Sequence, residues 1–236
     1  MKYTKYNKDI EVSYTFGLFP TFELLKHKVE QVECIITHSK LKTDSEDIKK
    51  LINICKENDI NVFEDDKTIN RLSDKENCFI IGVFKKYIST PSCDRHIVLD
   101  NPSDMGNLGT IMRTMLGFGL TDLFVTTPCV DYFNPKVIRA SMGAIFSLNI
   151  VELENIHEYL NNSDKEKYLF MLNGKQNLGS FKTPKTNYAL IFGNEARGLD
   201  KDLVTAGNSV LIKHKNTIDS LNLPISVGMA IYEFNK

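Results

Sequence analysis

Hydrophobic residues recur along this chain in two patterns. Short runs rich in β-branched and aromatic side chains, such as residues 32–38 and 122–126, have the composition of buried strands. Residues 44–58 instead place apolar side chains three or four positions apart with lysine and glutamate between them, which is the spacing of an amphipathic helix. The alternation of the two patterns predicts an α/β protein in which a mainly parallel sheet is covered on both faces.

The predicted elements follow this alternation along the chain. Strands are expected at residues 32–38, 60–63, 78–84, 96–100, 122–126, 144–153, 168–172, 189–192 and 210–212. Helices are expected at residues 17–28, 44–58, 107–118 and 135–142, and in the short segment DKTINRL between the second and third strands. The polar residues 85–95 contain a proline and no apolar period, so we place a linker there with a boundary near Ser92, and expect domains 1–92 and 93–236.

Residues 210–234 predict a strand, a polar loop and a final helix. Apolar side chains occupy almost every face of that helix, so we expect it to be enclosed by protein rather than to lie on a surface. Ser220 and Asn222 are good N-cap residues, and Pro224 suits a first helical turn. The simpler interpretation of these residues is a well-capped terminal helix. The alternative is that the polar residues at the start of an enclosed helix form a binding site.

Composition narrows the classes of protein that the chain can represent. With 236 residues and 42% apolar content it can bury a sizeable core. It has no apolar run long enough to span a bilayer, and its polar beginning does not look like a signal peptide, so we expect a cytoplasmic protein. Five widely spaced cysteines argue against a disulfide framework and against a zinc site.

The charge of the chain leaves a nucleic-acid partner open. The net charge is −1, so contacts with phosphates would have to come from local patches. The first ten residues interleave lysines with Tyr3 and Tyr6 and could touch nucleic acid, although a solvated tail is the simpler interpretation. Further candidate contacts, each of which is otherwise a solvated surface charge, are Lys85, Lys86, Arg139, Lys213 and Lys215.

Three polar loops follow predicted strands, at residues 100–113, 193–199 and 213–222. Because ligands of parallel sheets bind beyond the carboxyl ends of the strands, we expect the three loops to converge on one site. In the first loop, Arg113 has small neighbours at helical spacing, which would let a ligand approach it. The second loop, GNEARGL, exposes backbone groups beside a carboxylate. Each feature alone also fits an ordinary surface arginine or a generic turn.

Four segments in order, NPSDMGNLGTIMR, NPKVIRASMGAIF, IFGNEARGL and DSLNLPISVGMAIYEF, resemble the SpoU (TrmH-type) branch of the SPOUT RNA methyltransferases. They fall within residues 97–234. The residues before them, with GLFPTFELL, look like the small substrate-binding domain of the ribosomal-protein L30e type that precedes the catalytic domain in many members. The resemblance therefore covers nearly the whole chain.

The resemblance implies an α/β catalytic domain that contains a trefoil knot and works as a homodimer. It also implies transfer of a methyl group from S-adenosylmethionine to a ribose 2′-hydroxyl in structured ribosomal or transfer RNA, without a metal. The positions that match the family's catalytic motifs are Asn107, Arg113, Glu195, Ser220 and Asn222. The positions that match its cofactor contacts are Gly193, Ile212 and Leu221. The chain departs from the family pattern at Met105 in place of a proline, Ala196 in place of a glycine, and Lys213-His214 in place of Pro-Met.

Arg113 has a central place in the chemistry that the resemblance implies. A sulfonium methyl group is already activated, so the protein mainly has to align it with the 2′-oxygen and help to remove the hydroxyl proton. An arginine keeps its proton at neutral pH and is a poor base. We therefore expect Arg113 to clamp an RNA phosphate and to stabilise the developing alkoxide, while the other four matched residues orient the ribose, the cofactor and Arg113.

Two other classes of protein stay open at this point. A non-catalytic RNA-binding protein could keep the fold, although it would be expected to lose Arg113 or the polar residues of the SLN segment, and both are present. An unrelated α/β enzyme that binds a phosphorylated small molecule would be expected to carry a P-loop or a GxGxxG turn after a strand, and the sequence contains neither.

Overall fold

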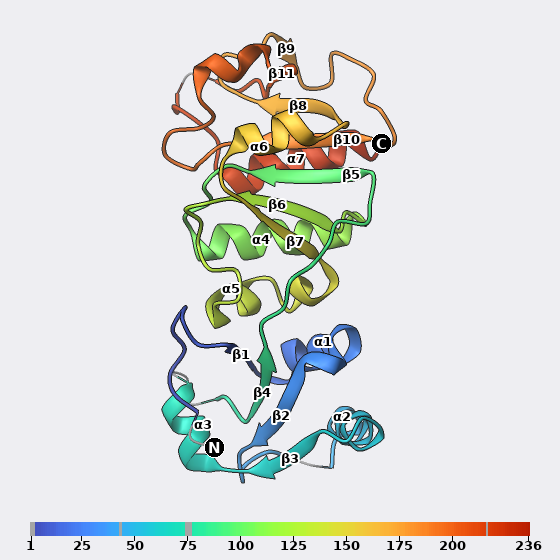
Figure 1. The fold of residues 1–236 in the computed structure, drawn as a ribbon, viewed down its shortest axis with the longest axis vertical. Helices are drawn as coiled ribbons and strands as arrows, with labels where there is room; N and C mark the ends of the chain where they lie inside the picture. Colours follow the sequence, from blue (N-terminus) through green and yellow to red (C-terminus); the bar gives the residue numbers. More distant parts are fainter. Residues whose placement is uncertain (1–2, 43, 74–76, 216) are drawn as a thin grey trace. The chain divides into compact units, whose positions relative to one another are not determined.

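The computed structural model describes residues 3–42, 44–73, 77–215 and 217–236, which form two compact units (Figure 1). One unit consists of Met1–Tyr87 and Asp131–Ser147, and the other of Ile88–Val130 and Leu148–Lys236. Each unit is built from two segments of the chain and has its own sheet. The expected division of function between residues 1–92 and 93–236 stays a prediction.

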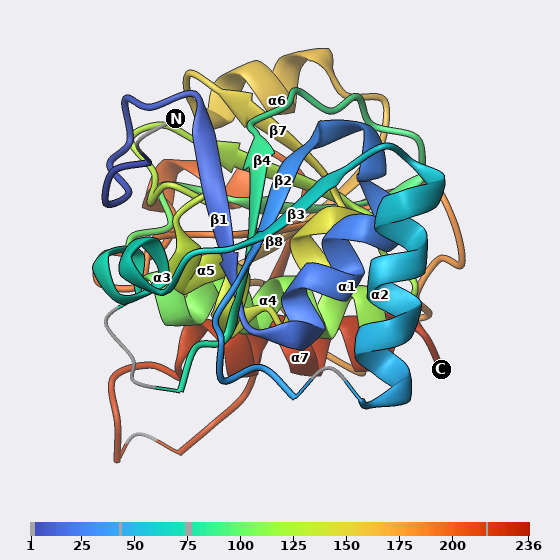
Figure 2. The same ribbon diagram turned by 90° about the horizontal axis from the view of Figure 1, so that it is seen from below.

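The first unit is a four-stranded sheet with helices on both faces (Figure 2). Its strands, in spatial order, are β1 (Val12–Phe16), β4 (Ile80–Lys85), β2 (Val32–Thr37) and β3 (Asn61–Glu64). Strand β2 pairs in parallel with β3 and antiparallel with β4, which is antiparallel to β1. Helices α1 (Leu18–His27) and α2 (Glu46–Glu57) share one core cluster, and α3 (Asp66–Leu72) belongs to the cluster on the other face. The second segment adds α5 (Pro135–Ala140), which contacts β1.

Residues near the amino terminus pack against this unit, so the prediction of a solvated tail is wrong. The ring of Tyr3 meets the ring of Tyr14 edge-on, with 6.4 Å between their centroids. The hydroxyl of Tyr6 donates a hydrogen bond to the carboxylate of Asp131. These aromatic contacts bury surface that a free tail would leave in water, which explains why the segment is fixed.

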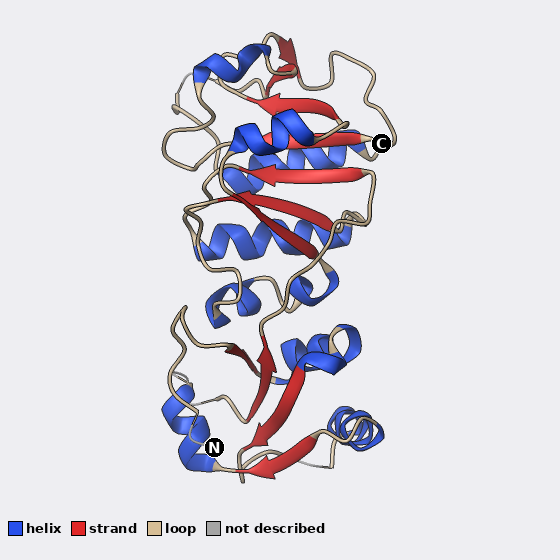
Figure 3. Ribbon diagram, in the orientation of Figure 1, coloured by secondary structure: helices blue, strands red, loops and turns tan. Residues whose placement is uncertain are grey.

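The second unit contains a seven-stranded parallel sheet. Its strands, in spatial order, are β7 (Asn149–Leu153), β6 (Asp122–Thr126), β5 (Arg95–Leu99), β10 (Tyr188–Phe192), β8 (Glu166–Phe170), β11 (Asn208–Leu211) and β9 (Gln176–Asn177). Figure 3 shows α6 (Ile156–Asn162) on one face of this sheet, and α4 (Met105–Gly117) and α7 (Leu223–Phe234) on the other. The short helix η3 (Lys201–Thr205) packs in the same core cluster as α6. The predicted parallel sheet with both faces covered is confirmed.

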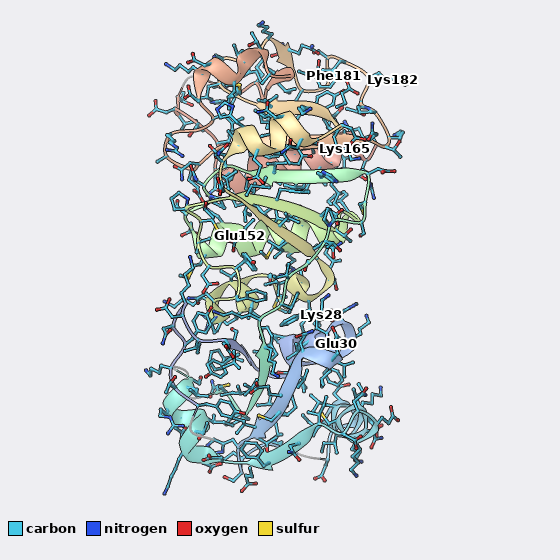
Figure 4. The ribbon with its side chains drawn as sticks, viewed as in Figure 1. Lys28, Glu30, Glu152, Lys165, Phe181 and Lys182 are labelled. Atoms are coloured by element: carbon cyan, nitrogen blue, oxygen red, sulfur yellow. The ribbon has the colours of Figure 1, made fainter. Side chains whose placement is uncertain are left out.

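Strand β11 lies between β8 and β9, although both of these precede it in the sequence. The turn that joins β8 to β9 touches β11 closely, because a Cβ on Gly174 would lie 2.4 Å from the carbonyl carbon of Val210. The connection from β9 to β10 is anchored by Phe181, labelled in Figure 4, whose ring stacks on Tyr168 at 5.6 Å. The last part of the chain therefore enters the sheet between two segments that precede it.

Helix α7 is covered on one side only. Val227, Ala230 and Ile231 are buried, whereas Ile225 is 57% exposed and Tyr232 is 58% exposed. The prediction of a helix enclosed on all faces is therefore wrong for the described chain. The apolar side chains on the other side of α7 are exposed. Neither α7 nor any other helix among the described residues is long and apolar enough to cross a membrane.

The strand predicted at residues 144–153 is half correct. Ala144–Ser147 forms a short 3-10 helix, and the strand β7 begins only at Asn149. Ala144, Ile145 and Phe146 are buried all the same. An apolar run of this length does not distinguish a strand from a buried helical turn, which is why the pattern misled the prediction.

Candidate active site

The three candidate loops follow β5, β10 and β11 of the second sheet, in which β5 and β10 are adjacent and β8 lies between β10 and β11. Strand β10 pairs in parallel with β5 on one side and with β8 on the other, and β8 pairs with β11. The carboxyl ends of these strands therefore lie along one edge of the sheet, as parallel pairing requires. The prediction that the loops after them converge is confirmed by side-chain contacts between the first two loops and by a cavity that the second and third loops share.

Glu195, in the loop after β10, holds the start of α4. Its Oε2 accepts hydrogen bonds from the Ser103 amide at 3.1 Å and from the Ser103 hydroxyl at 2.8 Å. Its Oε1 accepts from the Asp104 amide at 3.3 Å and from the Asn107 side-chain amide at 3.4 Å. Two predicted catalytic residues, Glu195 and Asn107, are thus in direct contact.

The contacts of Glu195 keep its carboxyl group ionised. Partial burial by itself would raise the pKa of Glu195, but hydrogen bonds from its own backbone, from Ser103 and from Asn107 outweigh that effect, and the pKa is lowered. An ionised carboxylate accepts hydrogen bonds and has no proton to donate at neutral pH. In this structure Glu195 is therefore a hydrogen-bond acceptor that holds its neighbours in place.

A second set of hydrogen bonds ties the loop after β10 to the loop after β5. The side-chain amide of Asn194 donates to the Asn101 carbonyl at 2.8 Å, and its oxygen accepts from the Ala196 amide at 3.0 Å. The Arg197 guanidinium donates to the Asn101 side-chain oxygen and lies 3.9 Å from the Asp100 carboxylate. These bonds fix the backbone around Glu195 from both sides.

Two glycines allow the loop after β10 to turn back on itself. The amide of Gly198 donates to the Asn194 carbonyl at 2.8 Å, and Gly198 has a φ of +70°, which favours glycine. A Cβ on Gly193 would lie 2.0 Å from the carbonyl carbon of Gly198. Any larger residue at position 193 would therefore displace the turn that carries Glu195.

A cavity of about 300 Å³ opens between the loops after β8, β10 and β11. All three predicted cofactor residues, Gly193, Ile212 and Leu221, line it, as do the predicted catalytic residues Glu195 and Ser220. His214, at one of the positions where the chain departs from the family pattern, also lines the cavity, with its Nδ1 2.9 Å from the Ile212 carbonyl oxygen.

The other three predicted catalytic residues, Asn107, Arg113 and Asn222, lie outside this cavity lining. Arg113 is exposed on α4 and makes no hydrogen bond or ion pair with any residue that the structure describes. Asn222 is the N-cap residue of α7, as its sequence position suggested, but its side chain makes no capping hydrogen bond. Its backbone carbonyl accepts from the Ile225 amide at 3.1 Å and from the Ser226 amide at 3.0 Å.

The lysines and arginine considered for RNA contacts differ in their surroundings. Lys86 is held in place, because its ammonium lies 4.9 Å from the centroid of the Tyr6 ring and donates to the Lys8 carbonyl at 2.7 Å. Four are exposed, namely Lys85, Arg139, Lys213 and Lys215. Their contact with RNA stays a prediction.

The sequence interpretation missed Ser103, which makes the shortest hydrogen bond to Glu195. It also missed Asp104, whose side chain caps α4 by accepting from the Asn107 amide at 2.7 Å. A signal was available, since serine and aspartate before a helical run are typical N-cap residues. In the described part of the chain, no three His, Cys, Asp or Glu side chains come together as a group that could hold a metal ion.

Comparison with known proteins decides the family. The model of the SpoU rRNA Methylase family matches residues 94–232, which is more than half of the chain. This protein belongs to the SpoU rRNA methylase family. The matched region contains all of the predicted catalytic and cofactor positions, and the family resemblance expected from the sequence motifs is confirmed.

Curated relatives match somewhat more than half of this chain. An uncharacterised tRNA/rRNA methyltransferase of Synechocystis sp. is 31% identical over 143 residues, which are 58% of this chain and 51% of that protein. The 23S rRNA (guanosine(2553)-2′-O)-methyltransferase RlmP of Bacillus subtilis is 27% identical over 139 residues, which are 58% of this chain and 56% of that protein. The chain thus spans about half the length of these curated relatives.

Among solved structures, the SpoU methyltransferase AviRb of Streptomyces viridochromogenes in complex with the cofactor AdoMet matches over 97% of this chain and 93% of that chain. The TM-score is 0.82 and the sequence identity is 19%. At this identity the likeness establishes the fold. It includes the small first unit as well as the SpoU region.

Proposed function

We propose that this protein transfers the methyl group of S-adenosylmethionine to the 2′-hydroxyl of a ribose in ribosomal or transfer RNA. The observation that carries the proposal is the single cavity whose lining joins the three predicted cofactor residues to Glu195 and Ser220. Membership of the SpoU family supports it, as does the name of the Bacillus subtilis relative, which specifies 2′-O-methylation of 23S rRNA.

The residues around the cavity fit S-adenosylmethionine. Gly193 presents bare backbone, since no side chain is tolerated there, and Ile212, Leu221 and Leu223 supply an apolar wall for a flat base. Polar groups of Glu195 and Ser220 lie in the same lining and can bind hydroxyl or amino groups. When bound, this cofactor supplies a methyl group on a sulfonium, which needs alignment rather than further activation.

In this proposal Glu195 and its contacts organise the reacting end of the site. The ionised carboxylate accepts hydrogen bonds from the side-chain amide of Asn107 and from the backbone amide of Asp104, and so it fixes the start of α4. Ser220 faces the same cavity from the loop before α7. Together they would orient the ribose hydroxyl through hydrogen bonds, which is the kind of positioning that accounts for much of the rate in transfer reactions of this kind.

Arg113 would act on the RNA rather than on the cofactor. A guanidinium binds a phosphate through two parallel hydrogen bonds and stabilises negative charge on a nearby oxygen. We assign it the role of a phosphate clamp and of a stabiliser of the developing alkoxide. Its side chain is exposed and carries no competing ion pair within the described residues, so it is available to an incoming strand.

We also propose that the protein works as a homodimer through the outer faces of α4 and α7. Helix α7 exposes Ile225, Met229 and Tyr232 at helical spacing, an apolar ridge that water would otherwise cover. The two helices pack together, and Arg113 lies on the exposed side of α4. A second copy presents the same ridge, so the patch is suited to a self-complementary interface. In such a dimer Arg113 would face the partner subunit.

The remaining expectations belong to the same proposal. We infer that residues 1–92 select a structured RNA target, in line with RNA recognition through shape and unstacked loops. We infer also that the end of the chain threads a knot. The position of β11 between β8 and β9 supports this threading.

The experiment that tests the proposed function compares Arg113→Ala and Arg113→Lys with the unchanged protein. We expect Arg113→Ala to lower methyl transfer to RNA by at least about 100-fold, because a charge-stabilising donor is removed. Cofactor affinity, measured by titration calorimetry, should stay the same, because Arg113 lies outside the cavity lining. Arg113→Lys should restore part of the rate.

Two outcomes would contradict the proposal. Turnover of Arg113→Ala at the rate of the unchanged protein would remove Arg113 from the mechanism. Cofactor binding without methyl transfer to any RNA would favour instead a non-catalytic RNA-binding protein that keeps the fold.

A further inference from the structure

The ring of His214 is anchored in the lining of the cavity between the loops after β8, β10 and β11. Its Nδ1 lies 2.9 Å from the carbonyl oxygen of Ile212, and a carbonyl oxygen only accepts, so Nδ1 carries the proton and donates it. In a neutral imidazole the other nitrogen then has a free lone pair. Nε2 of His214 makes no hydrogen bond or ion pair with the other described residues of the chain. The half-buried side chain thus brings one fixed acceptor to the cavity.

This acceptor is a feature of the chain itself. Lys213-His214 stands where the family pattern has Pro-Met, so an imidazole takes the place of a methionine thioether, which is only a weak acceptor. The position is well defined, because Ile212, two residues earlier, is buried directly after the end of β11. The contacts that the family shares therefore do not account for a side-chain acceptor at this place.

The surroundings of His214 indicate which part of a bound cofactor it meets. Ile212, Leu221 and Leu223 form the apolar wall that suits a flat base. Because the imidazole is hydrogen-bonded to the backbone of Ile212, it borders this wall. A base that packs against the wall turns its edge toward the bordering groups. The donor on the edge of an adenine is its exocyclic amino group, which is the partner that an unprotonated nitrogen requires.

The charged groups of the lining suit the other end of the cofactor. Glu195 and Arg197 are already held by hydrogen bonds to the loop after β5 and the start of α4. Lys201 and Asp219 are exposed and make no ion pair with any residue in the described ranges. One cation and one anion match the carboxylate and the ammonium group of an amino-acid tail. The neutral acceptor of His214 is thereby left for the base.

We propose that Nε2 of His214 accepts a hydrogen bond from the exocyclic amino group of S-adenosylmethionine and selects adenine as the base of the cofactor. The inference rests on the proposed function in one respect, namely that this cavity holds the cofactor. A base with an oxygen in place of the amino group, such as hypoxanthine, would set a second acceptor against Nε2 and lose the hydrogen bond. His214 is therefore a specificity-determining residue of the cofactor site.

The test compares the Kd of S-adenosylhomocysteine with that of S-inosylhomocysteine by titration calorimetry. His214→Asn keeps a donor within reach of the Ile212 carbonyl but has no acceptor at the place of Nε2, whereas the longer side chain of His214→Gln keeps one. We expect His214→Asn to raise the Kd of the adenosyl ligand about fivefold and to leave that of the inosyl ligand unchanged, because one neutral hydrogen bond is lost. His214→Gln should keep most of the preference for adenine. So should the control Ile218→Asn, since Ile218 is exposed in the same loop and does not line the cavity.

The outcomes separate this inference from the proposed function. An undiminished preference for adenine in His214→Asn would overturn the inference and leave the function intact. Equal weakening of both ligands would also overturn it, because the ring would then act on another part of the cofactor or only on the loop. If His214→Asn loses the preference while the unchanged protein methylates no RNA, the proposed function is wrong and the assignment of His214 holds. An unchanged protein that binds neither ligand would contradict both.

Discussion

At the scale of single residues, Glu195 connects the fold to the chemistry. One carboxylate joins the loop after β10 to the first turn of α4 and touches Asn107. Because hydrogen bonds from Ser103 and Asn107 favour its ionised form, the carboxylate sets the position of these neighbours. Replacing it should therefore change stability and site geometry together.

We predict that Glu195→Gln lowers the free energy of unfolding by about 1–2 kcal/mol at pH 7, because an amide cannot accept all the hydrogen bonds that Ser103 and Asn107 donate. The sign of the pH dependence follows from the lowered pKa in the folded protein. The carboxylate stabilises the fold above its unfolded pKa of about 4.3, and this contribution is lost as the pH falls through the lower folded value.

Urea unfolding of both proteins at neutral and acidic pH measures this contribution. The difference between the unchanged protein and Glu195→Gln should shrink below about pH 4. A difference that stays constant across this range would show that the ionised form of Glu195 has no special stabilising role.

The motifs predicted Glu195 and Asn107 as site residues, but they could not predict how the two are held. Ser103 and Glu195 are 92 positions apart in the sequence, and their hydrogen bond depends on β5 and β10 being neighbours in the sheet. For Arg113, too, the motif predicted the residue but not where its side chain lies. Its place in the motif is clear, while its position outside the cavity lining depends on which face of α4 is covered.

At the scale of elements, the tight turn after β10 is the most sensitive part of the site. We predict that Gly193→Ala weakens cofactor binding by more than about tenfold, since the new methyl group would overlap the Gly198 backbone. Gly117→Ala is the matched control, because nothing lies within 4 Å of a Cβ at that position in α4. Calorimetric titration with S-adenosylmethionine measures both, and equal affinities for the two variants would contradict the packing argument.

Most helices and strands could be predicted from the pattern of apolar residues, and the failures have physical causes. Strand β1 was missed because its buried positions include Ser13 and Thr15. Their hydroxyls find partners that the sequence does not reveal, namely the Phe133 carbonyl at 2.5 Å and the Thr21 hydroxyl at 2.7 Å. The segment VSYTF does alternate apolar and polar residues, but its polar positions are buried as well, so the pattern does not show that both faces of the strand are covered.

At the scale of the whole molecule, the exposed ridge of α7 is the feature that a single chain does not explain. An apolar helix that is buried on one side only suggests that a second chain covers the other side. The apolar pattern of this helix predicted burial on every face, and within the described chain that prediction is wrong. The source of that burial, in our proposal, is a partner copy rather than the same chain.

We predict that Ile225→Asp weakens self-association by at least about 30-fold, because a charge in the centre of an apolar interface is left unpaired. Phe63→Asp is the matched control, since Phe63 is a 41% exposed apolar residue in the other unit. Sedimentation equilibrium should give a dimer for the unchanged protein and for the control, and a monomer for Ile225→Asp. A monomeric unchanged protein would contradict the proposed dimer.

The central claim of this account is methyl transfer to a ribose 2′-hydroxyl of RNA. The most direct measurement is transfer of labelled methyl from S-adenosylmethionine to total unmodified RNA, followed by alkaline hydrolysis. Since 2′-O-methylation blocks cleavage of the adjacent phosphodiester, we predict that the label appears in hydrolysis-resistant dinucleotides. Label released in mononucleotides would mean that a base is methylated instead, and absence of label from RNA would contradict the claim.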